Sequence, residues 1–157
     1  AVLLTSEEFA RQHHLPVQAF FHDAQSAAVD HVHGAGLLMA PTLAVAQMIK
    51  RNRLTLQDFD FYEIHEAFAG QVLSTLKAWE SEAYCRKELG LDKALGPIDR
   101  SKMNVKGGSL ALGHPFGATG SRVVGTMAKL LQEKGSGRGL VSVCTGGGMG
   151  VVAILQR

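Results

Sequence analysis

The stretch LVSVCTGGGMGVVAIL, residues 140–155, holds two apolar segments separated by a run of glycines. Leu140 to Val143 is rich in β-branched residues and predicts a strand, and Val151 to Leu155 predicts another. Because only the turn from Gly146 to Gly150 joins them, we expect the two strands to pair antiparallel. Cys144 follows directly on the first of these strands.

Upstream of this hairpin, strand-like and helix-like patterns alternate. Apolar runs from Val17 to Phe21 and from Phe59 to Ile64 predict two further strands. Three helices are predicted from apolar residues at helical spacing, and Gly135 marks the end of the third. Their apolar positions are Ala44, Val45, Met48 and Ile49; Phe68, Val72, Leu73, Leu76 and Trp79; and Val123, Val124, Met127, Leu130 and Leu131. The alternation predicts an α/β fold with a mostly parallel sheet and an antiparallel edge hairpin.

The composition is that of one soluble globular domain: 157 residues, 46% hydrophobic and 19% charged, with a formal net charge of +2. Basic residues are scattered among acidic ones, which argues against a nucleic-acid partner. No apolar stretch is long enough to cross a bilayer and no cleavable leader opens the chain, so we expect no transmembrane segment. Cytoplasm is the default compartment, with an organelle left open, and two distant cysteines predict no disulfide framework.

The start of the chain is unusual for a domain. Ala1 to Leu4 is apolar, lacks a polar lead-in, and predicts the end of a buried strand. Thr5 to Glu8 then has a capping-box pattern that opens a short helix. A domain that begins inside a core strand is expected to be part of a longer protein.

Three motifs carry residues that could do chemistry. Cys144 and His65 each follow a predicted strand, and His114 lies in the glycine-rich segment from Gly113 to Gly120, before the third helix. Ligands gather at the carboxyl ends of strands in such sheets, so we expect the thiol and the two imidazoles to converge on one glycine-rimmed cavity. One cysteine and two histidines suit acyl transfer, because a thiol needs a neighbouring base to act at neutral pH.

Each of these residues also has a plainer explanation. Cys144 could be a core cysteine in a tight hairpin, and from its position alone the two explanations weigh about equally. His65 and His114 could be structural histidines. For His114 the flanking glycines favour function, because they would let a substrate approach the ring.

Two other groups are expected to stay outside the chemistry. Asp30, His31 and His33 could bind a metal only if the segment were extended, so we expect no metal site there. Cys85 lies among charged residues and is expected to be a partly exposed helix residue.

Three segments of the chain resemble the C-terminal signatures of the thiolase family, in family order. They are His65-Glu66-Ala67-Phe68-Ala69, Gly107-Gly108 with Ala111 to Gly120, and Cys144 to Gly150. The resemblance covers nearly the whole chain and outweighs the plainer explanations of Cys144 and His114. The His-Glu-Ala-Phe form and the long insertion from Glu80 to Met103 resemble the β-subunits of fatty-acid oxidation complexes, whereas the Gly-Gly-Gly-Met-Gly ending is similar to simpler thiolases.

The resemblance implies a role for each catalytic candidate. Cys144 matches the acid/base thiol, which moves a proton between the substrate α-carbon and solvent or the coenzyme A sulfur. His114 matches the residue that activates the nucleophile and helps to hold the oxyanion. His65 stands where many thiolases have an asparagine that positions a water for the enolate oxyanion.

It also implies contacts with the substrate. The amide of Gly146 matches one donor of the second oxyanion hole, to which His114 belongs as well. Phe68 matches a residue that lines the acyl or pantetheine pocket, although packing under its own helix is about as good an explanation. Gly147 is assigned to substrate binding beside it.

As a thiolase half, the chain is expected to have a mixed five-stranded sheet in a βαβαβαββ pattern. Residues 1–14 would be the last strand and helix of the N-terminal half, and residues 15–157 the C-terminal domain. The implied reaction is acyl transfer between 3-ketoacyl-CoA and CoA to give acetyl-CoA plus a shortened acyl-CoA, or the reverse Claisen condensation. CoA and acyl-CoA are substrates, and no covalently bound cofactor is implied.

Neither cysteine matches the acylated nucleophile, which lies in the N-terminal half of thiolases, so we expect the isolated chain to be inactive. The implied partners are that half and further copies of the full subunit in a homodimer or tetramer. An accompanying hydratase/dehydrogenase subunit is left open.

Two other functions stay open. The chain could be a stand-alone half-domain that pairs with a partner or binds acyl-CoA without catalysis, against which the strand-like start argues. It could also be a self-sufficient hydrolase that uses Cys144 and His114. A hydrolase would be acylated at Cys144, whereas a thiolase would be acylated elsewhere in the parent protein.

Overall fold

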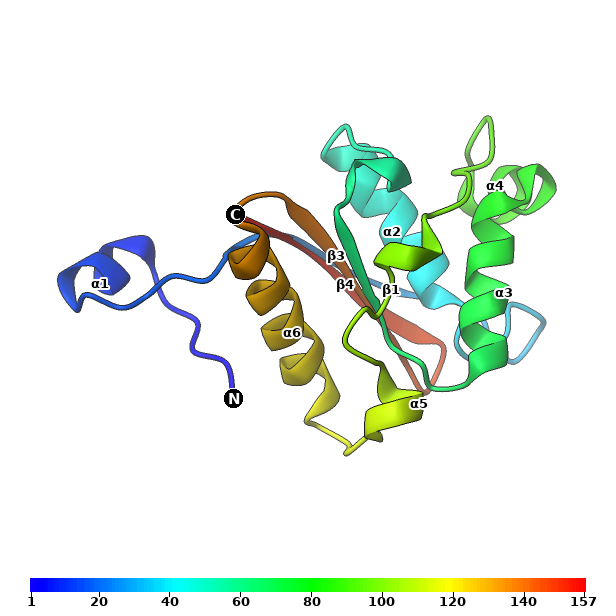
Figure 1. Ribbon diagram of the computed structural model, residues 1–157. Helices are drawn as coiled ribbons and strands as arrows, with labels where there is room; N and C mark the ends of the chain where they lie inside the picture. Colours follow the sequence, from blue (N-terminus) through cyan, green and yellow to red (C-terminus); the bar gives the residue numbers. More distant parts are fainter.

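The computed structural model describes residues 1–157, which fold around one mixed sheet (Figure 1). Its strands are β1 (Phe20–Ala28), β2 (Phe61–Ile64), β3 (Arg138–Thr145) and β4 (Met149–Gln156), in the order β1-β4-β3-β2. β2 and β3 are parallel, and β4 is antiparallel to both of its neighbours. The predicted α/β class and the predicted hairpin are confirmed, whereas the prediction of a mostly parallel sheet is wrong, because only the β2–β3 pair is parallel.

The sheet has four strands, so the prediction of a five-stranded sheet is wrong. At the free edge of β2, Met103 makes only an isolated parallel bridge with Tyr62. The next residue, Asn104, has a φ of 49° and bonds Ile64 through its side chain: Oδ1 accepts from the Ile64 amide at 2.8 Å, and Nδ2 donates to the Ile64 carbonyl at 2.9 Å. The side chain thus replaces the backbone pairing, and the chain leaves the sheet after one residue.

The hairpin was also wrongly expected at the edge of the sheet. β1 pairs along the far side of β4, from Phe20 opposite Gln156 to Ala28 opposite Met149, so β4 is an interior strand. The reason is composition, since residues 152–155 of β4 are all apolar and buried. β1 contains four polar residues and no buried ones, which suits an edge strand.

Helices cover both faces of the sheet and give three layers (Figure 1). α2 (Ala40–Arg51) and α3 (Ala69–Glu80) pack on one face, α4 (Glu82–Leu89) packs against these two helices, and α6 (Thr119–Lys134) packs on the other face. Alternate residues of β4 point to opposite faces: Val152 and Ile154 join a cluster of fifteen buried apolar residues under α2 and α3. Ala153 and Leu155 join a cluster of six under α6.

Two helices test predictions about individual residues, Gly135 and Cys85. α6 ends at Gly135, whose φ of 90° is the left-handed cap expected from the sequence. In α4, Cys85 is 0% exposed, so the expectation of a partly exposed cysteine is wrong. Its Sγ faces the end of α3 and bonds the carbonyls of Ala78 and Trp79 at 3.5 and 3.6 Å.

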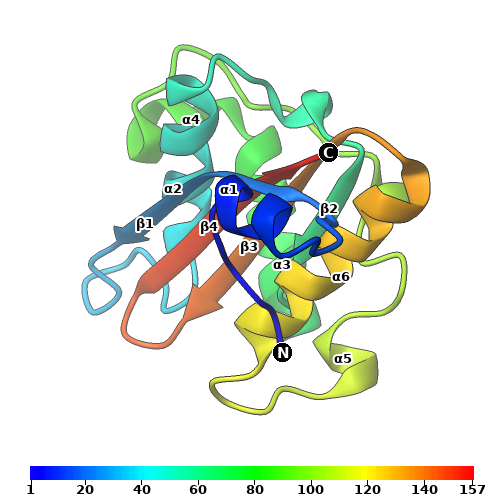
Figure 2. The ribbon, with the colours of Figure 1, turned by 90° about the vertical axis from the view of Figure 1, so that its left-hand side faces the viewer.

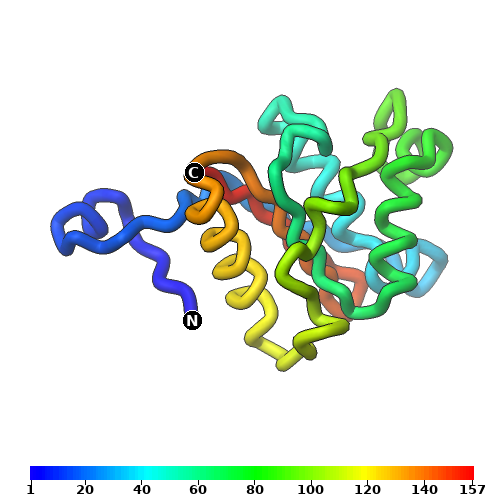
Figure 3. The backbone as a smooth tube through the Cα atoms, viewed as in Figure 1, coloured from blue at the N-terminus to red at the C-terminus, as the bar shows by residue number.

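The N-terminal segment stands apart from the sheet, as the ribbon and the backbone trace show (Figures 1 and 3). α1 (Glu7–Gln12) is the helix expected there, and Ser6 caps it by accepting a hydrogen bond from the Phe9 amide at 3.1 Å. Residues 1–4 are exposed and form no strand, so the strand expected there is absent. Assignment of residues 1–14 to a preceding half stays a prediction.

The remaining elements are short: α5 (Ser109–Leu112) and 3-10 turns at Leu56–Asp58 and Arg100–Lys102. None of the helices combines the length and the apolar character needed to cross a membrane.

Candidate active site

The candidate site lies where the parallel strands β2 and β3 end. Ile64 is paired with Ser142, and the ladder extends one bond further because the His65 amide donates to the Ser142 carbonyl at 2.8 Å. Cys144 lies two residues further along β3. His114 reaches this end of the sheet from the loop that precedes α6. The three sequence motifs therefore come from adjacent segments at one edge of the fold.

His65 is a buried, neutral imidazole. The residue is 3% exposed, and its Nδ1 lies 2.9 Å from the hydroxyl oxygen of Ser109. Burial lowers the pKa of His65 below its usual value, and the nearby His114 and Arg122 lower it further, against a smaller opposing effect of Glu66. An uncharged ring has one N–H donor and one acceptor nitrogen, so its tautomer decides what it offers to a ligand.

His114 faces His65 from the loop before α6. The two ring centroids are 4.3 Å apart, and the His114 Nδ1 lies 2.6 Å from the hydroxyl oxygen of Thr119, at the start of α6. Unlike His65, His114 is exposed. Gly113 has a φ of 84°, a conformation that β-carbon-bearing residues rarely adopt, and this turn aims the loop back at the strand ends.

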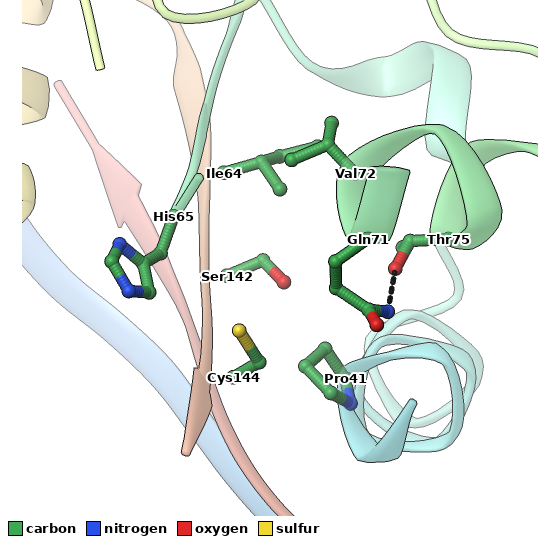
Figure 4. Close-up of a pocket in the computed structure, with 8 residues that line it drawn as sticks. All are labelled: Pro41, Ile64, His65, Gln71, Val72, Thr75, Ser142 and Cys144. Atoms are coloured by element: carbon green, nitrogen blue, oxygen red, sulfur yellow. Dashed lines mark hydrogen bonds between the residues drawn. The ribbon is translucent and has the colours of Figure 1, made fainter. Parts of the chain in front are cut away.

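Cys144 lies on the wall of a small pocket at the same edge (Figure 4). The pocket measures about 10 Å³, room for about one water, and His65, Gln71, Thr75 and Ser142 line it as well. Burial raises the pKa of the Cys144 thiol, while the Ala67 amide has a smaller lowering effect. A thiol with a raised pKa is protonated at neutral pH and can donate that proton.

The three candidates are thus linked through His65. Its ring is tilted by 48° to that of His114, and His65 also lines the pocket that contains Cys144, although its ring points away from Pro41, Gln71 and Thr75 (Figure 4). His114 is not among the residues that line this pocket.

The glycine turn after Cys144 is closely packed on one side and open on the other. A β-carbon on Gly148 would lie 2.6 Å from the Val29 carbonyl oxygen, and one on Gly150 would lie 2.7 Å from Pro41. At Gly146 a β-carbon would meet nothing within 4 Å. Gly146 and Gly147 are exposed, so their backbone is accessible to a ligand.

Phe68 caps the start of α3 and points outward. Its side chain is 66% exposed, which rules out the alternative that it packs under its own helix. An exposed phenylalanine beside the strand ends offers an apolar surface to a ligand.

Glu66 holds the loop that carries His114, a function that the sequence pattern did not reveal. Its carboxylate accepts from Asn104 Nδ2 at 2.8 Å and from the Leu110 amide at 3.1 Å. Gly108 lies so close that a β-carbon there would overlap the carboxylate. The glycine pair at 107–108 was the only sequence signal of this close approach.

Three further residues near His65 were also missed: Glu63, Ser109 and Arg122. Arg122 of α6 donates through Nη2 to the Ser109 hydroxyl at 2.9 Å. Glu63 is a buried carboxyl on β2, and burial raises its pKa to about 7 against the lowering effect of Arg122. A glutamate inside the apolar strand Phe61–Ile64 was the available signal for this polar group.

The loop that contains His31 forms a surface turn. Asp30 accepts hydrogen bonds from the amides of Val32 and His33 at 3.1 Å, and its other oxygen lies 2.8 Å from the His33 ring. Asp30 therefore serves as a cap for this turn.

The sequence matches a known family over most of its length. The family model described as "Thiolase, C-terminal domain" matches residues 15–157. A 3-ketoacyl-CoA thiolase from Yersinia pestis (strain Pestoides F) is 38% identical over 156 residues, which is 99% of this chain and 35% of that protein. The chain thus spans about a third of the length of the curated relatives that it matches.

Solved structures share the fold. The acetyl-CoA acetyltransferase of Bacillus anthracis matches with a TM-score of 0.76 and 33% identity, over 96% of this chain and 33% of that one. The peroxisomal 3-ketoacyl-CoA thiolase of Saccharomyces cerevisiae matches with a TM-score of 0.74 and 34% identity, over 95% of this chain and 37% of that one. The yeast enzyme is described as a five-layered α-β-α-β-α structure built from two core domains of identical topology.

Proposed function

The chain belongs to the thiolase family, as its C-terminal domain, and on that basis we propose that it supplies the acid/base half of an acyltransferase site. The complete subunit would cleave 3-ketoacyl-CoA with CoA to give acetyl-CoA and a shortened acyl-CoA, or run the Claisen condensation in reverse. CoA compounds are the substrates, and no covalently bound cofactor takes part. The observation that carries the proposal is the 4.3 Å approach of His65 and His114, with Cys144 in the pocket that His65 lines.

Cys144 is proposed to move the α-proton. When the nucleophilic cysteine of the upstream half attacks the 3-keto carbon, the bond between the α- and β-carbons breaks, and acetyl-CoA leaves as an enolate. The Cys144 thiol gives its proton to that enolate carbon and becomes a thiolate. The thiolate then takes the proton of the incoming CoA thiol, which attacks the acyl-enzyme and restores both cysteines. The burial that raises the pKa of Cys144 supports a thiol that starts the cycle protonated.

The two histidines are proposed to serve the nucleophile and the oxyanions. His114 would take the proton of the upstream cysteine and then hold an oxyanion with its free ring nitrogen, because its Nδ1 is engaged by Thr119. His65, buried and neutral, would donate an N–H or hold a water for the enolate oxygen. The exposed amide of Gly146 would be a second oxyanion donor, and Phe68 and Gly147 would contact the acyl-CoA.

The partner half is proposed to cover the α6 side of the sheet. α6 packs along β2 and β3, while β1 lies at the opposite edge of the sheet (Figure 2). Apolar side chains on the uncovered part are about half exposed: Phe21 on β1, and Met149 and Val151 on β4. Half-exposed apolar side chains on this face of the sheet suit a surface that a permanent partner covers. Further copies of the subunit, and a hydratase/dehydrogenase subunit, would attach to other parts of the complete protein.

Turnover by the complete subunit tests this function, and the 157-residue chain alone is the control. We expect the complete subunit to consume 3-ketoacyl-CoA and CoA and the chain alone to be inactive, because neither Cys85 nor Cys144 is the proposed nucleophile. Cys144→Ala in the complete subunit should lower kcat by about 10²–10⁴-fold, the usual contribution of a positioned acid or base.

Two outcomes would overturn the proposal. Thiolysis by the isolated chain would mean that one of its own cysteines carries the acyl group. Unchanged kcat in the Cys144→Ala subunit would remove Cys144 from the proton transfer.

A further inference from the structure

A buried polar chain leads to His65 from α6. Ser109, at the start of α5, is 7% exposed, and its hydroxyl oxygen has two partners. One is His65 Nδ1 at 2.9 Å, and the other is Arg122 Nη2, also at 2.9 Å. Nothing in the acyl-transfer scheme requires Ser109 or Arg122 to touch a substrate.

The hydrogen-bonding capacity of these groups determines the direction of both bonds. A guanidinium has donors and no acceptor, so Arg122 donates to the Ser109 oxygen. The hydroxyl of Ser109 has one proton, and Nδ1 of His65 is the only acceptor within reach of it. If Nδ1 carried a proton, the hydroxyl would receive two donors and its own buried proton would have no partner, which is costly. Nδ1 is therefore the acceptor, and the proton of the neutral ring lies on Nε2.

The charge around Arg122 favours the same state. The Arg122 cation stands near the ring and opposes a second positive charge there, as burial does. Glu63 approaches Arg122 from β2, yet its Oε1 and the Nε and Nη1 of Arg122 have no protein partner. The hydroxyl oxygen of Ser109 is thus the one protein acceptor that the Arg122 guanidinium hydrogen-bonds.

We propose that Ser109 and Arg122 are positioning residues that hold His65 as a neutral imidazole with its proton on Nε2, so that the ring presents an N–H donor to the site. The effect of this tautomer on catalysis rests on the proposed function, whereas the assignment of the tautomer does not. The role follows from geometry, because α6 brings the Arg122 donor and α5 brings the Ser109 hydroxyl to the Nδ1 side of the ring. Together they leave the proton of the ring on Nε2.

Long-range proton–nitrogen correlation spectra of the isotopically labelled chain test the tautomer. The His65 signals are assigned by their loss in His65→Gln. We expect a protonated, pyrrole-like Nε2 and an unprotonated Nδ1 whose shift shows that it accepts a hydrogen bond. A protonated Nδ1, or a rapidly averaged pair of tautomers, would overturn the proposal.

Variants separate positioning from packing. Ser109→Ala should abolish the hydrogen-bond shift of Nδ1, and Arg122→Met should give a mixture of tautomers, because the hydroxyl oxygen is then free to accept from Nδ1. Ser121→Ala, a serine on the exposed side of α6, is the matched control and should leave the His65 signals unchanged. Unchanged signals in Ser109→Ala would contradict the proposal.

Activity of the complete subunit distinguishes this inference from the function on which it rests. There, Ser109→Ala should lower kcat by about tenfold with little change in KM, since it weakens an interaction with the developing oxyanion. A wild-type His65 with Nε2 protonated in an inactive complete subunit would refute the acyltransferase and leave the tautomer standing. An active subunit in which His65 Nδ1 is protonated would refute the tautomer and leave the acyltransferase standing.

Discussion

The two faces of the sheet differ in what they bury. Under α2 and α3 lies a cluster of fifteen apolar residues, to which β2 contributes Tyr62 and Ile64. Under α6 the apolar cluster has six members, and β2 contributes Phe61 at its margin and the buried carboxyl of Glu63. The first face can account for most of the stability of the fold. The second face has a smaller apolar core, because polar groups around the candidate site occupy part of it.

The largest effect on stability is expected from the apolar face. Trp79 is fully buried in the fifteen-residue cluster, so Trp79→Ala should lower the free energy of unfolding by about 3–5 kcal/mol. Leu73→Ala, on the same helix but 49% exposed, is the control and should cost less than about 1 kcal/mol. Urea unfolding measures both, and similar losses for the two variants would contradict the contrast between the faces.

Glu63 should make the α6 face sensitive to pH. Its pKa of about 7 in the fold lies above the ordinary 4.5, so the folded state binds this proton more tightly than the unfolded chain does. The stabilisation from this group is complete below pH 4.5 and is lost as pH rises through about 7, an effect of about 3 kcal/mol. Glu63→Gln removes the titration, so its stability relative to wild type should be higher at pH 8 than at pH 5.

Urea unfolding at both pH values gives that difference. Glu80→Gln, at a surface glutamate 3.9 Å from the Lys77 amine, controls for loss of a carboxylate. If the Glu63→Gln variant differed from wild type equally at pH 5 and pH 8, the buried carboxyl would not titrate in this window.

A smaller effect is expected where α6 packs on β3. A β-carbon on Gly139 would overlap the side chain of Met127, so Gly139→Ala should destabilise the fold by about 1–3 kcal/mol. Gly125→Ala on α6 is the matched control, because its β-carbon would make only an ordinary contact of 3.6 Å with Val2. We expect this control to stabilise the fold by about 0.5–1 kcal/mol. Equal effects of the two variants in urea unfolding would refute close packing at this point.

Sequence pattern predicted the buried sides of the helices better than the extent of the strands. Val72, Leu76 and Trp79 of α3 are buried as expected, because helical spacing alone determines which side faces the core. β1 was expected at residues 17–21 but extends from Phe20 to Ala28. Its small and polar residues carry no strand signal, and backbone pairing with β4 determines their conformation.

The same distinction holds at the candidate site. The adjacency of His65 and His114 follows from motifs at strand ends, which a sequence displays. The contacts of Ser109 and Arg122 depend on the path of the loop between Asn104 and Thr119, which Glu66 fixes through hydrogen bonds. Those long-range contacts have no local pattern.

The central claim is that Cys144, and not the other thiol of the chain, moves the substrate α-proton. Exchange of the α-protons of acetyl-CoA with deuterated water, catalysed by the complete subunit, tests it most directly. We predict that Cys144→Ala abolishes this exchange, while Cys85→Ser, whose hydroxyl can keep the bonds to the end of α3, retains it. Exchange that persists without the Cys144 thiol would contradict the account.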